Sequence, residues 1–298
     1  MFPASFEYHR ATSLADASRA LRHFGPDARL MAGGQTLIPM LKLRLVRPSH
    51  LVDLGGVAES RGVELGPDAL VIGALATHAA IADTAAASRF PIIADCGGGI
   101  ADAQVRNLGT VGGSLAEADP CGCWPTLLSA LDARVRCSGP DGERTVAVRE
   151  LLRDAYSPAL RDAELLAEVV VDRAALDGDG AFVAFKRAAA AYPTASCALQ
   201  LQMRGEVVER VCLSLGCVAM TPVVVDEATA ILQGERPSAA LIGQVADAAA
   251  RQAQPLSDNK GSEEYKRSLV RGLVARAFEI VQRRRARQPH PPTHTYYG

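Results

Sequence analysis

The chain is organised around Val105-Arg106-Asn107-Leu108-Gly109-Thr110-Val111-Gly112-Gly113-Ser114-Leu115-Ala116-Glu117-Ala118-Asp119-Pro120, the second glycine stretch. In its middle, Gly112 and Gly113 stand between the hydroxyl side chains of Thr110 and Ser114. Because glycine has no Cβ, the backbone can turn tightly there and bring its N–H groups close to a ligand. Residues 110–114 are therefore predicted to form a phosphate-binding loop.

An earlier stretch, Leu30-Met31-Ala32-Gly33-Gly34-Gln35-Thr36-Leu37, is the first glycine stretch. In this stretch a short apolar run ends at Gly33-Gly34, and the amide side chain of Gln35 and the hydroxyl side chain of Thr36 follow. An isolated Gly-Gly pair is most often an ordinary turn, but two such stretches indicate that one diphosphate is held between them. Gly97-Gly98-Gly99 lacks the final glycine of G-x-G-x-x-G and no G-x-x-x-x-G-K-[ST] run exists, which argues against a Rossmann or P-loop site.

Length and charge set broad bounds on the protein. A chain of 298 residues is long enough for two domains. The formal net charge is −1 with 22% charged residues, so no global field indicates nucleic-acid binding. The N-terminal residues do not form a secretory signal, and no apolar stretch approaches the ~20 residues of a membrane span. The expected location is the cytoplasm.

Local patterns predict the elements before the first glycine stretch and after it. Ser13 begins a helix that Gly25 ends, and residues 28–32 form a strand that leads into the first glycine stretch. Residues 37–45 then form a short helix, interrupted at Pro39.

The later elements follow an α+β order. Thr77 caps an alanine-rich helix that runs to Ser88, and the polar joint Asp177-Gly178-Asp179-Gly180 marks the domain boundary. Strands precede helices beyond this joint, which is typical of a sheet backed by helices. The predicted strands are residues 182–186, 194–203 and 207–219.

Cysteines, histidines and the basic C-terminal segment give no separate site. The cysteines are odd in number and scattered over both halves, which favours small buried side chains over a disulfide framework or an iron–sulfur ligand set: Cys96, Cys121, Cys123, Cys137, Cys197, Cys212 and Cys217. The sequence has no C-x-x-C pair, and no zinc site is expected from it. The basic residues 283–287 are predicted to be a solvated helix end, and residues 289–298 an extended arm or a disordered tail.

These motifs resemble the FAD-binding medium subunit of the molybdenum hydroxylases, the relatives of carbon monoxide dehydrogenase and xanthine dehydrogenase. The resemblance extends in order over nearly the whole chain. Besides the two glycine stretches, it rests on Leu51-Val52-Asp53-Leu54, Ile72-Gly73-Ala74-Leu75-Ala76-Thr77-His78, Phe185-Lys186-Arg187-Ala188, Leu215-Gly216-Cys217-Val218-Ala219-Met220-Thr221-Pro222 and Ser262-Glu263-Glu264-Tyr265-Lys266-Arg267.

The resemblance implies an α+β fold of two domains. The first is an FAD-binding domain of the PCMH, or vanillyl-alcohol-oxidase-like, type over residues 1–177, with subdomains of about 1–55 and 56–177. The second is a C-terminal flavoprotein domain of the carbon monoxide dehydrogenase type over residues 178–288, a three-stranded antiparallel sheet with helices. Residues 289–298 form the tail.

The resemblance also implies a site in which the two glycine stretches wrap the FAD diphosphate. A cation at Lys186, near the pyrimidine side of the flavin, would favour the anionic reduced form and raise the potential; the alternative is a lysine that extends from a strand end to solvent. No catalytic or metal-binding residue is implied. The implied FAD-binding residues are Met31, Ala32, Gly33, Gly34, Gln35, Thr36, Leu37, Ile100, Thr110, Gly112, Gly113, Ser114, Asp119, Cys123, Leu165, Lys186 and Tyr192.

Two positions depart from the family pattern. Relatives commonly carry a carboxylate three residues after the Asp119-Pro120 pair, where it accepts a hydrogen bond from a ribose hydroxyl, and this chain has Cys123. A thiol is a poor acceptor, so either FAD is held less tightly on the adenosine side or Asp119 takes over. Alanines at residues 188–191 stand where relatives carry an arginine and an acidic residue.

The function that the resemblance implies is that of the FAD-carrying subunit of a three-part molybdenum hydroxylase. It would accept electrons from the [2Fe–2S] centres of a small partner subunit and pass them to an external acceptor, while a molybdopterin-binding large subunit oxidises the substrate. The expected assembly is a dimer of heterotrimers. One alternative is a self-contained flavin oxidoreductase, and another is a scaffold subunit that has lost FAD, which Cys123 favours and the glycine stretches oppose.

Overall fold

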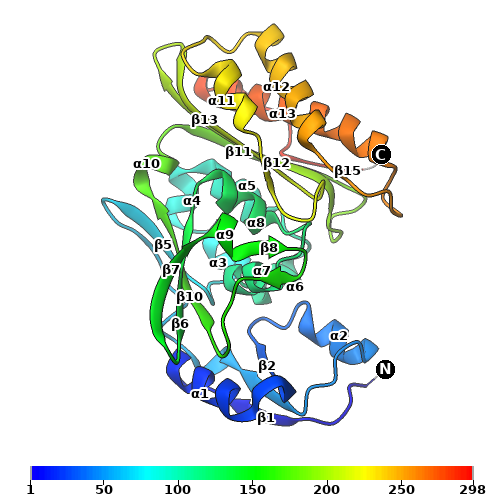
Figure 1. The fold of residues 1–298 in the computed structure, drawn as a ribbon. Helices are drawn as coiled ribbons and strands as arrows, with labels where there is room; N and C mark the ends of the chain where they lie inside the picture. Colours follow the sequence, from blue (N-terminus) through cyan, green and yellow to red (C-terminus); the bar gives the residue numbers. More distant parts are fainter. Residues whose placement is uncertain (1, 297–298) are drawn as a thin grey trace.

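The computed structural model describes residues 2–296 and shows three units that follow one another in chain order (Figure 1). Each unit contains its own main sheet, with strand orders β1-β3-β2, β4-β5-β10-β6-β7 and β14-β13-β12-β11-β15. The mixture of sheets and helices confirms the predicted α+β fold class. Among residues 2–296, no helix is both long and apolar enough to pass through a bilayer.

The N-terminal unit is a small parallel sheet with two helices. It consists of β1 (Glu7–Arg10), α1 (Leu14–Phe24), β2 (Ala28–Met31), α2 (Leu37–Leu43) and β3 (His50–Asp53), with the 3-10 turns Gly25–Asp27 and Leu54–Gly56. The predicted start and end of α1 are confirmed, because the Ser13 side chain accepts from the Asp16 amide and Gly25 has a φ of 61°. The predicted interruption at Pro39 is wrong, because Pro39 lies in the first turn of α2, where amides need no helical acceptor.

The middle unit is a five-stranded antiparallel sheet covered by short helices. Its elements are β4 (Val63–Leu65), β5 (Ala69–Gly73), α3 (His78–Ala82), α4 (Ala85–Arg89), α5 (Pro91–Gly98), α6 (Ala103–Leu108), α7 (Val111–Glu117), α8 (Cys123–Ala130), β6 (Arg134–Gly139), β7 (Gly142–Ala147), α9 (Val148–Leu151), β8 (Leu152–Asp154), β9 (Ser157–Pro158), β10 (Leu165–Asp172) and α10 (Arg173–Leu176). The central strand, β10, was not predicted. The single predicted helix over residues 77–88 is wrong, because the Thr84 hydroxyl accepts from the Ala87 amide and starts a second helix.

The C-terminal unit is a sheet with helices packed on one face (Figure 1). It contains β11 (Asp179–Lys186), β12 (Pro193–Arg204), β13 (Val207–Gly216), β14 (Val223–Val224), α11 (Asp226–Leu232), α12 (Ala239–Gln252), α13 (Glu263–Arg285) and β15 (His294–Tyr296). The three predicted strands are present, but the sheet has two more: β14 pairs antiparallel with β13, and β15 pairs parallel with β11. The predicted boundary at residues 177–180 stays a prediction.

The C-terminal segment holds the last two units together. Arg284 donates from its two Nη atoms to both carboxylate oxygens of Asp95 in α5, at 2.8 and 2.7 Å, and these side chains are only 14% and 9% exposed. The prediction of a solvated helix end is therefore wrong at Arg284. The tail is not disordered over residues 294–296, because β15 joins the sheet and His294 Nε2 hydrogen-bonds to the Asp95 carbonyl at 2.8 Å. Residues 297–298 lie outside the described residues.

Candidate functional site

A cavity of about 1270 Å³ lies between the N-terminal unit and the other two units. Every predicted site residue lines this cavity, from Met31 in the first glycine stretch to Tyr192 in the C-terminal unit. Sites for small molecules usually measure about 300–1,000 Å³. The cavity therefore has room for a ligand as large as a dinucleotide.

The first glycine stretch presents backbone amides without acceptors to this cavity. Gly34 turns the chain between β2 and α2 with a φ of 70°. The first amide to enter the bonding of α2 is that of Ile38, which donates to the Gly34 carbonyl at 2.9 Å. Within residues 2–296, the amides of residues 33–37 have no acceptor. A run of free amides is suited to an anion such as a diphosphate.

The two glycine stretches touch each other directly. A Cβ on Gly33 would lie 1.9 Å from the carbonyl oxygen of Leu108, so only glycine fits at this contact. Gly112 packs closely against Ala74, because a Cβ on Gly112 would lie 2.6 Å from the Cβ of Ala74. The shape of the cavity wall therefore depends on close contacts at Gly33 and Gly112, and a larger residue at either position would force the contacting segments apart.

The second glycine stretch begins helix α7, so the prediction of a loop over residues 110–114 is wrong. Thr110 caps the helix, and its hydroxyl accepts from the Gly113 amide at 3.0 Å. The amides of Val111 and Gly112 donate to carbonyl oxygens just before α3, at 3.1 and 2.8 Å. The amide of Ser114 donates to the Thr110 carbonyl at 3.0 Å. The hydroxyl hydrogens of Thr110 and Ser114, rather than these amides, are left for a ligand.

Lys186 is a buried cation at the end of β11. Lys186 is only 1% exposed, and its Nζ donates to the Gly99 carbonyl. Burial lowers the pKa of Lys186, because an ammonium loses its hydration inside the protein. No carboxylate of the described residues lies within 4.0 Å of Nζ. An anionic ligand in the cavity would compensate this charge.

Cys123, Asp119 and Tyr192 line the same cavity. Burial raises the pKa of the Cys123 thiol to about 11, so Cys123 is neutral at pH 7 and does not replace a carboxylate. Its sulfur is close enough to Lys186 for the two groups to affect each other's pKa. Asp119 Oδ1 accepts from the Cys121 amide at 2.8 Å. Tyr192 is 50% exposed, so its ring stands at the opening of the cavity.

Two parts of the wall were missed by sequence reasoning. His78, which is 6% exposed, accepts at Nδ1 from Trp124 Nε1 at 2.9 Å, and its amide donates to the Gly109 carbonyl at 3.0 Å. Burial lowers the pKa of His78 to about 4, so the ring is neutral at pH 7. The segment that leads into β10 was also missed, although Leu165 was predicted; there Glu164 accepts from Arg144 at 2.6 and 2.8 Å.

Comparison with known proteins identifies the family of the chain. A family described as FAD binding domain in molybdopterin dehydrogenase matches residues 4–173, and one described as CO dehydrogenase flavoprotein C-terminal domain matches residues 180–281. The chain belongs to the FAD-binding subunits of the molybdenum hydroxylases. The predicted family is confirmed, and FAD is the cofactor of this oxidoreductase subunit.

Relatives match this FAD-binding subunit over almost their whole length. The carbon monoxide dehydrogenase medium chain of Afipia carboxidovorans is 37% identical over 95% of this chain and 99% of that chain. The glyceraldehyde dehydrogenase medium chain of Sulfolobus acidocaldarius is 32% identical over 94% and 100%. The solved carbon monoxide dehydrogenase of Hydrogenophaga pseudoflava, which lacks the Mo-pyranopterin moiety of its molybdenum cofactor, superposes with a TM-score of 0.92 at 33% identity over 95% and 99%.

Proposed function

We propose that this chain is the electron-transfer subunit of a heterotrimeric molybdenum hydroxylase, placed between a [2Fe–2S] small subunit and an external acceptor. A molybdopterin-binding large subunit would oxidise the substrate, and two heterotrimers would form the assembly in the cytoplasm. The relatives support a multisubunit enzyme, because their names call them medium chains. The observation that carries the proposal is one cavity lined by both the free amides of residues 33–37 and the buried ammonium of Lys186.

Different residues of the cavity would bind different parts of FAD. The amides of residues 33–37 and the hydroxyls of Thr110 and Ser114 would hold the diphosphate, with Gln35 and Thr36 beside it. The apolar side chains of Ile100 and Leu165 would exclude water from the rest of the cofactor. FAD, when bound, supplies the redox chemistry, and the protein supplies binding, orientation and electrostatics.

Lys186 has the clearest electrostatic role. A cation buried in a medium of low dielectric stabilises negative charge beside it more than a solvated cation does. If Lys186 lies beside the flavin, it favours the reduced, anionic form of the ring. The half-exposed Tyr192 would cover the ring at the opening of the cavity.

The first experiment is the visible spectrum of the purified chain, followed by release of the chromophore by heat and its identification by mass. We expect flavin bands and one FAD per chain. A colourless chain that also fails to bind added FAD would remove every enzyme function and leave a scaffold.

A second experiment separates electron transfer between subunits from a self-contained oxidoreductase. The FAD-loaded chain is mixed with a reduced [2Fe–2S] small subunit and, separately, with small organic reductants alone. We expect bleaching of the flavin bands only with the protein partner. Equal bleaching by the small reductants alone would support a self-contained enzyme instead.

A further inference from the structure

Glu7, His9 and His50 bring three possible metal ligands together on one face of the N-terminal sheet. β1 pairs in parallel with β3, which sets Glu7 beside His50. Because side chains alternate along a strand, His9 lies on the same face as Glu7. His9 Nε2 is 3.1 Å from His50 Nδ1, and Glu7 Oε2 is 3.5 Å from His50 Nδ1 and 3.9 Å from His9 Nε2.

Phe24, at the end of α1, fixes the two imidazole rings. Its ring stacks on His50 with centroids 4.0 Å apart and planes at 14°, and on His9 at 4.5 Å and 27°. The side chains of His9 and His50 are 32% and 22% exposed, and that of Glu7 is 73% exposed. The rings are therefore held in place from one side while the other side is open to water.

We propose that Glu7, His9 and His50 form a binding site for a divalent transition metal ion of the zinc type. A point equidistant from the three ligand atoms at these separations lies about 2 Å from each, which is the length of Zn–N and Zn–O bonds. Two imidazoles with one carboxylate suit zinc and its neighbours rather than magnesium or calcium, which prefer oxygen ligands alone. The open side leaves a fourth position for water.

A hydrogen bond between the two rings explains only part of this geometry. It accounts for the 3.1 Å separation of the two nitrogens, but it does not place a carboxylate oxygen within 4 Å of both rings. Three ligand atoms that all lie within 4 Å of one another meet the distance requirement for binding one ion together. The test below separates the two explanations by measuring metal binding directly.

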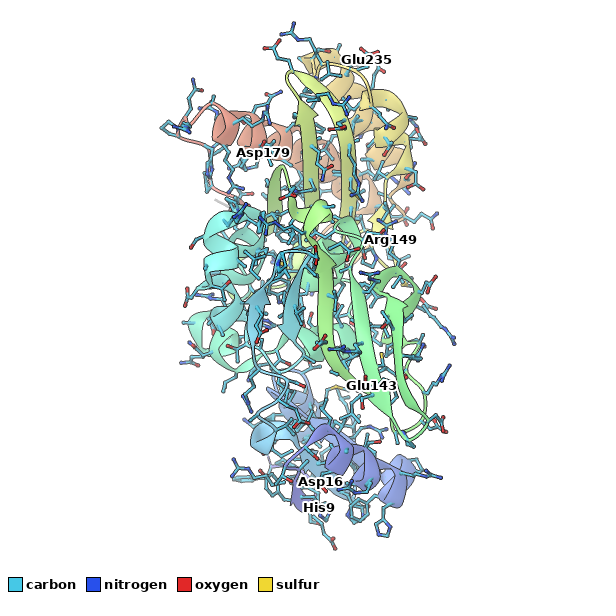
Figure 2. The ribbon with its side chains drawn as sticks, turned by 90° about the vertical axis from the view of Figure 1, so that its left-hand side faces the viewer. His9, Asp16, Glu143, Arg149, Asp179 and Glu235 are labelled. Carbon is cyan, nitrogen blue, oxygen red and sulfur yellow. The ribbon has the colours of Figure 1, made fainter. Side chains whose placement is uncertain are left out.

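The proposed metal site is separate from the FAD cavity. None of its three residues lines that cavity, and Figure 2 shows His9 at the outer end of the N-terminal unit, opposite the end that carries Glu235. Because β1 is an edge strand and β3 is the strand paired with it, a bound ion would tie the two strands together. Metal binding should therefore raise the thermal stability of the chain without changing its FAD content.

The experiment is calorimetric titration of Zn²⁺ into the full-length chain after removal of metals with a chelator, at pH 7.5. We expect one Zn²⁺ per chain and a rise in Tm. His9→Ala and His50→Ala should each weaken Zn²⁺ binding by about 100-fold, and Glu7→Gln by about tenfold, since removal even of groups that only support the ligands costs on the order of 10–100-fold. The Glu7→Gln side chain is exposed, so this variant tests the ligand without risk to folding.

His23→Ala is the matched control, because its exposed ring also contacts Phe24, with centroids 4.8 Å apart, but is outside the cluster. This control should bind Zn²⁺ like the unmodified chain. Substitution with Co²⁺ should give visible bands without the thiolate charge-transfer absorption that cysteine ligands would add. No binding, binding unchanged in both histidine variants, or a thiolate signal would each overturn the proposal.

Discussion

The two glycine stretches look alike in sequence and do different things in the structure. In the first, the amides of residues 33–37 have no acceptor within the described chain, so the backbone itself is available to a ligand. In the second, the amides of residues 111–114 already have acceptors, and the Thr110 and Ser114 hydroxyls remain. A Gly-Gly pair therefore indicates that another group comes close to the backbone. Whether that group is a ligand or another part of the protein depends on the surrounding contacts.

The strongest way to break this comparison is to separate the two stretches. Gly33→Ala places a Cβ 1.9 Å from the Leu108 carbonyl oxygen, a backbone atom that cannot rotate away. We expect loss of most bound FAD and a fall of about 3 kcal/mol in the free energy of unfolding, as for an overpacked contact. The measurements are the ratio of FAD to protein and urea unfolding.

Gly272→Ala is the control for this variant, because Gly272 lies in α13 with open space around its Cβ position. This control should keep its FAD and be slightly stabilised, since alanine favours a helix. Full FAD occupancy in Gly33→Ala would show that the contact between the stretches does not shape the site.

Local patterns predicted those features that depend on neighbours in the sequence. The caps of α1, the three predicted strands of the C-terminal unit and both Gly-Gly pairs are of this kind, and the family resemblance added Lys186 to the cavity. The residues that were missed depend on distant partners. Arg284 pairs with Asp95, 189 positions away, and His78 is buried by Trp124, 46 positions away. The proposed metal site could not be predicted from the sequence either, because His9 and His50 come from different strands, β1 and β3.

The second glycine stretch became a helix for a physical reason that its sequence did not reveal. Glycine is unfavourable inside a helix, which made a loop the natural prediction for residues 110–114. In the structure, Thr110 caps α7, and only a glycine at position 112 fits against Ala74. Close packing in three dimensions therefore outweighed the local preference.

Acid should destabilise the chain through His78, which supports the second glycine stretch by donating its amide to the Gly109 carbonyl at 3.0 Å. Burial lowers the pKa of His78 to about 4. Below pH 6.5, the ordinary pKa of histidine, the unfolded chain binds a proton that the folded chain does not, so stability falls as the pH drops from 6.5 towards 4. We expect His78 to contribute a loss of about 2 kcal/mol between pH 7.5 and 5.

The measurement is urea unfolding of the FAD-free chain at both pH values. His78→Asn keeps an acceptor for Trp124 but does not titrate, so it should lose less stability in acid than the unmodified chain. The exposed His23→Asn variant should behave like the unmodified chain. Identical pH dependence in all three proteins would contradict the role assigned to His78.

Lys186 differs from both glycine stretches, because we expect it to affect stability and the flavin potential through its charge. Lys186→Met removes a buried ammonium without a carboxylate partner, so the FAD-free chain should become more stable. With FAD bound, the midpoint potential of the flavin should fall by about 30 mV, equivalent to about 1.4 kcal/mol for a two-electron couple. Redox titration with indicator dyes measures this shift. Lys42→Met, at an exposed position of α2, should change neither quantity, and an unchanged potential in Lys186→Met would place Lys186 away from the flavin.

The smallest expected effect compares one hydroxyl from each stretch. Thr110→Ala removes the cap of α7 and should lower the free energy of unfolding by about 1 kcal/mol. It should also weaken FAD binding, because the second stretch has only side chains to offer. Thr36→Ala should stay within about 0.5 kcal/mol of the unmodified chain, since the Thr36 hydroxyl caps nothing and the first stretch binds through its amides. Fluorescence titration of FAD and urea unfolding measure both effects, and Thr110→Ser should restore them. Equal losses of FAD affinity in Thr110→Ala and Thr36→Ala would mean that both stretches bind through side chains, and the distinction between them would fail.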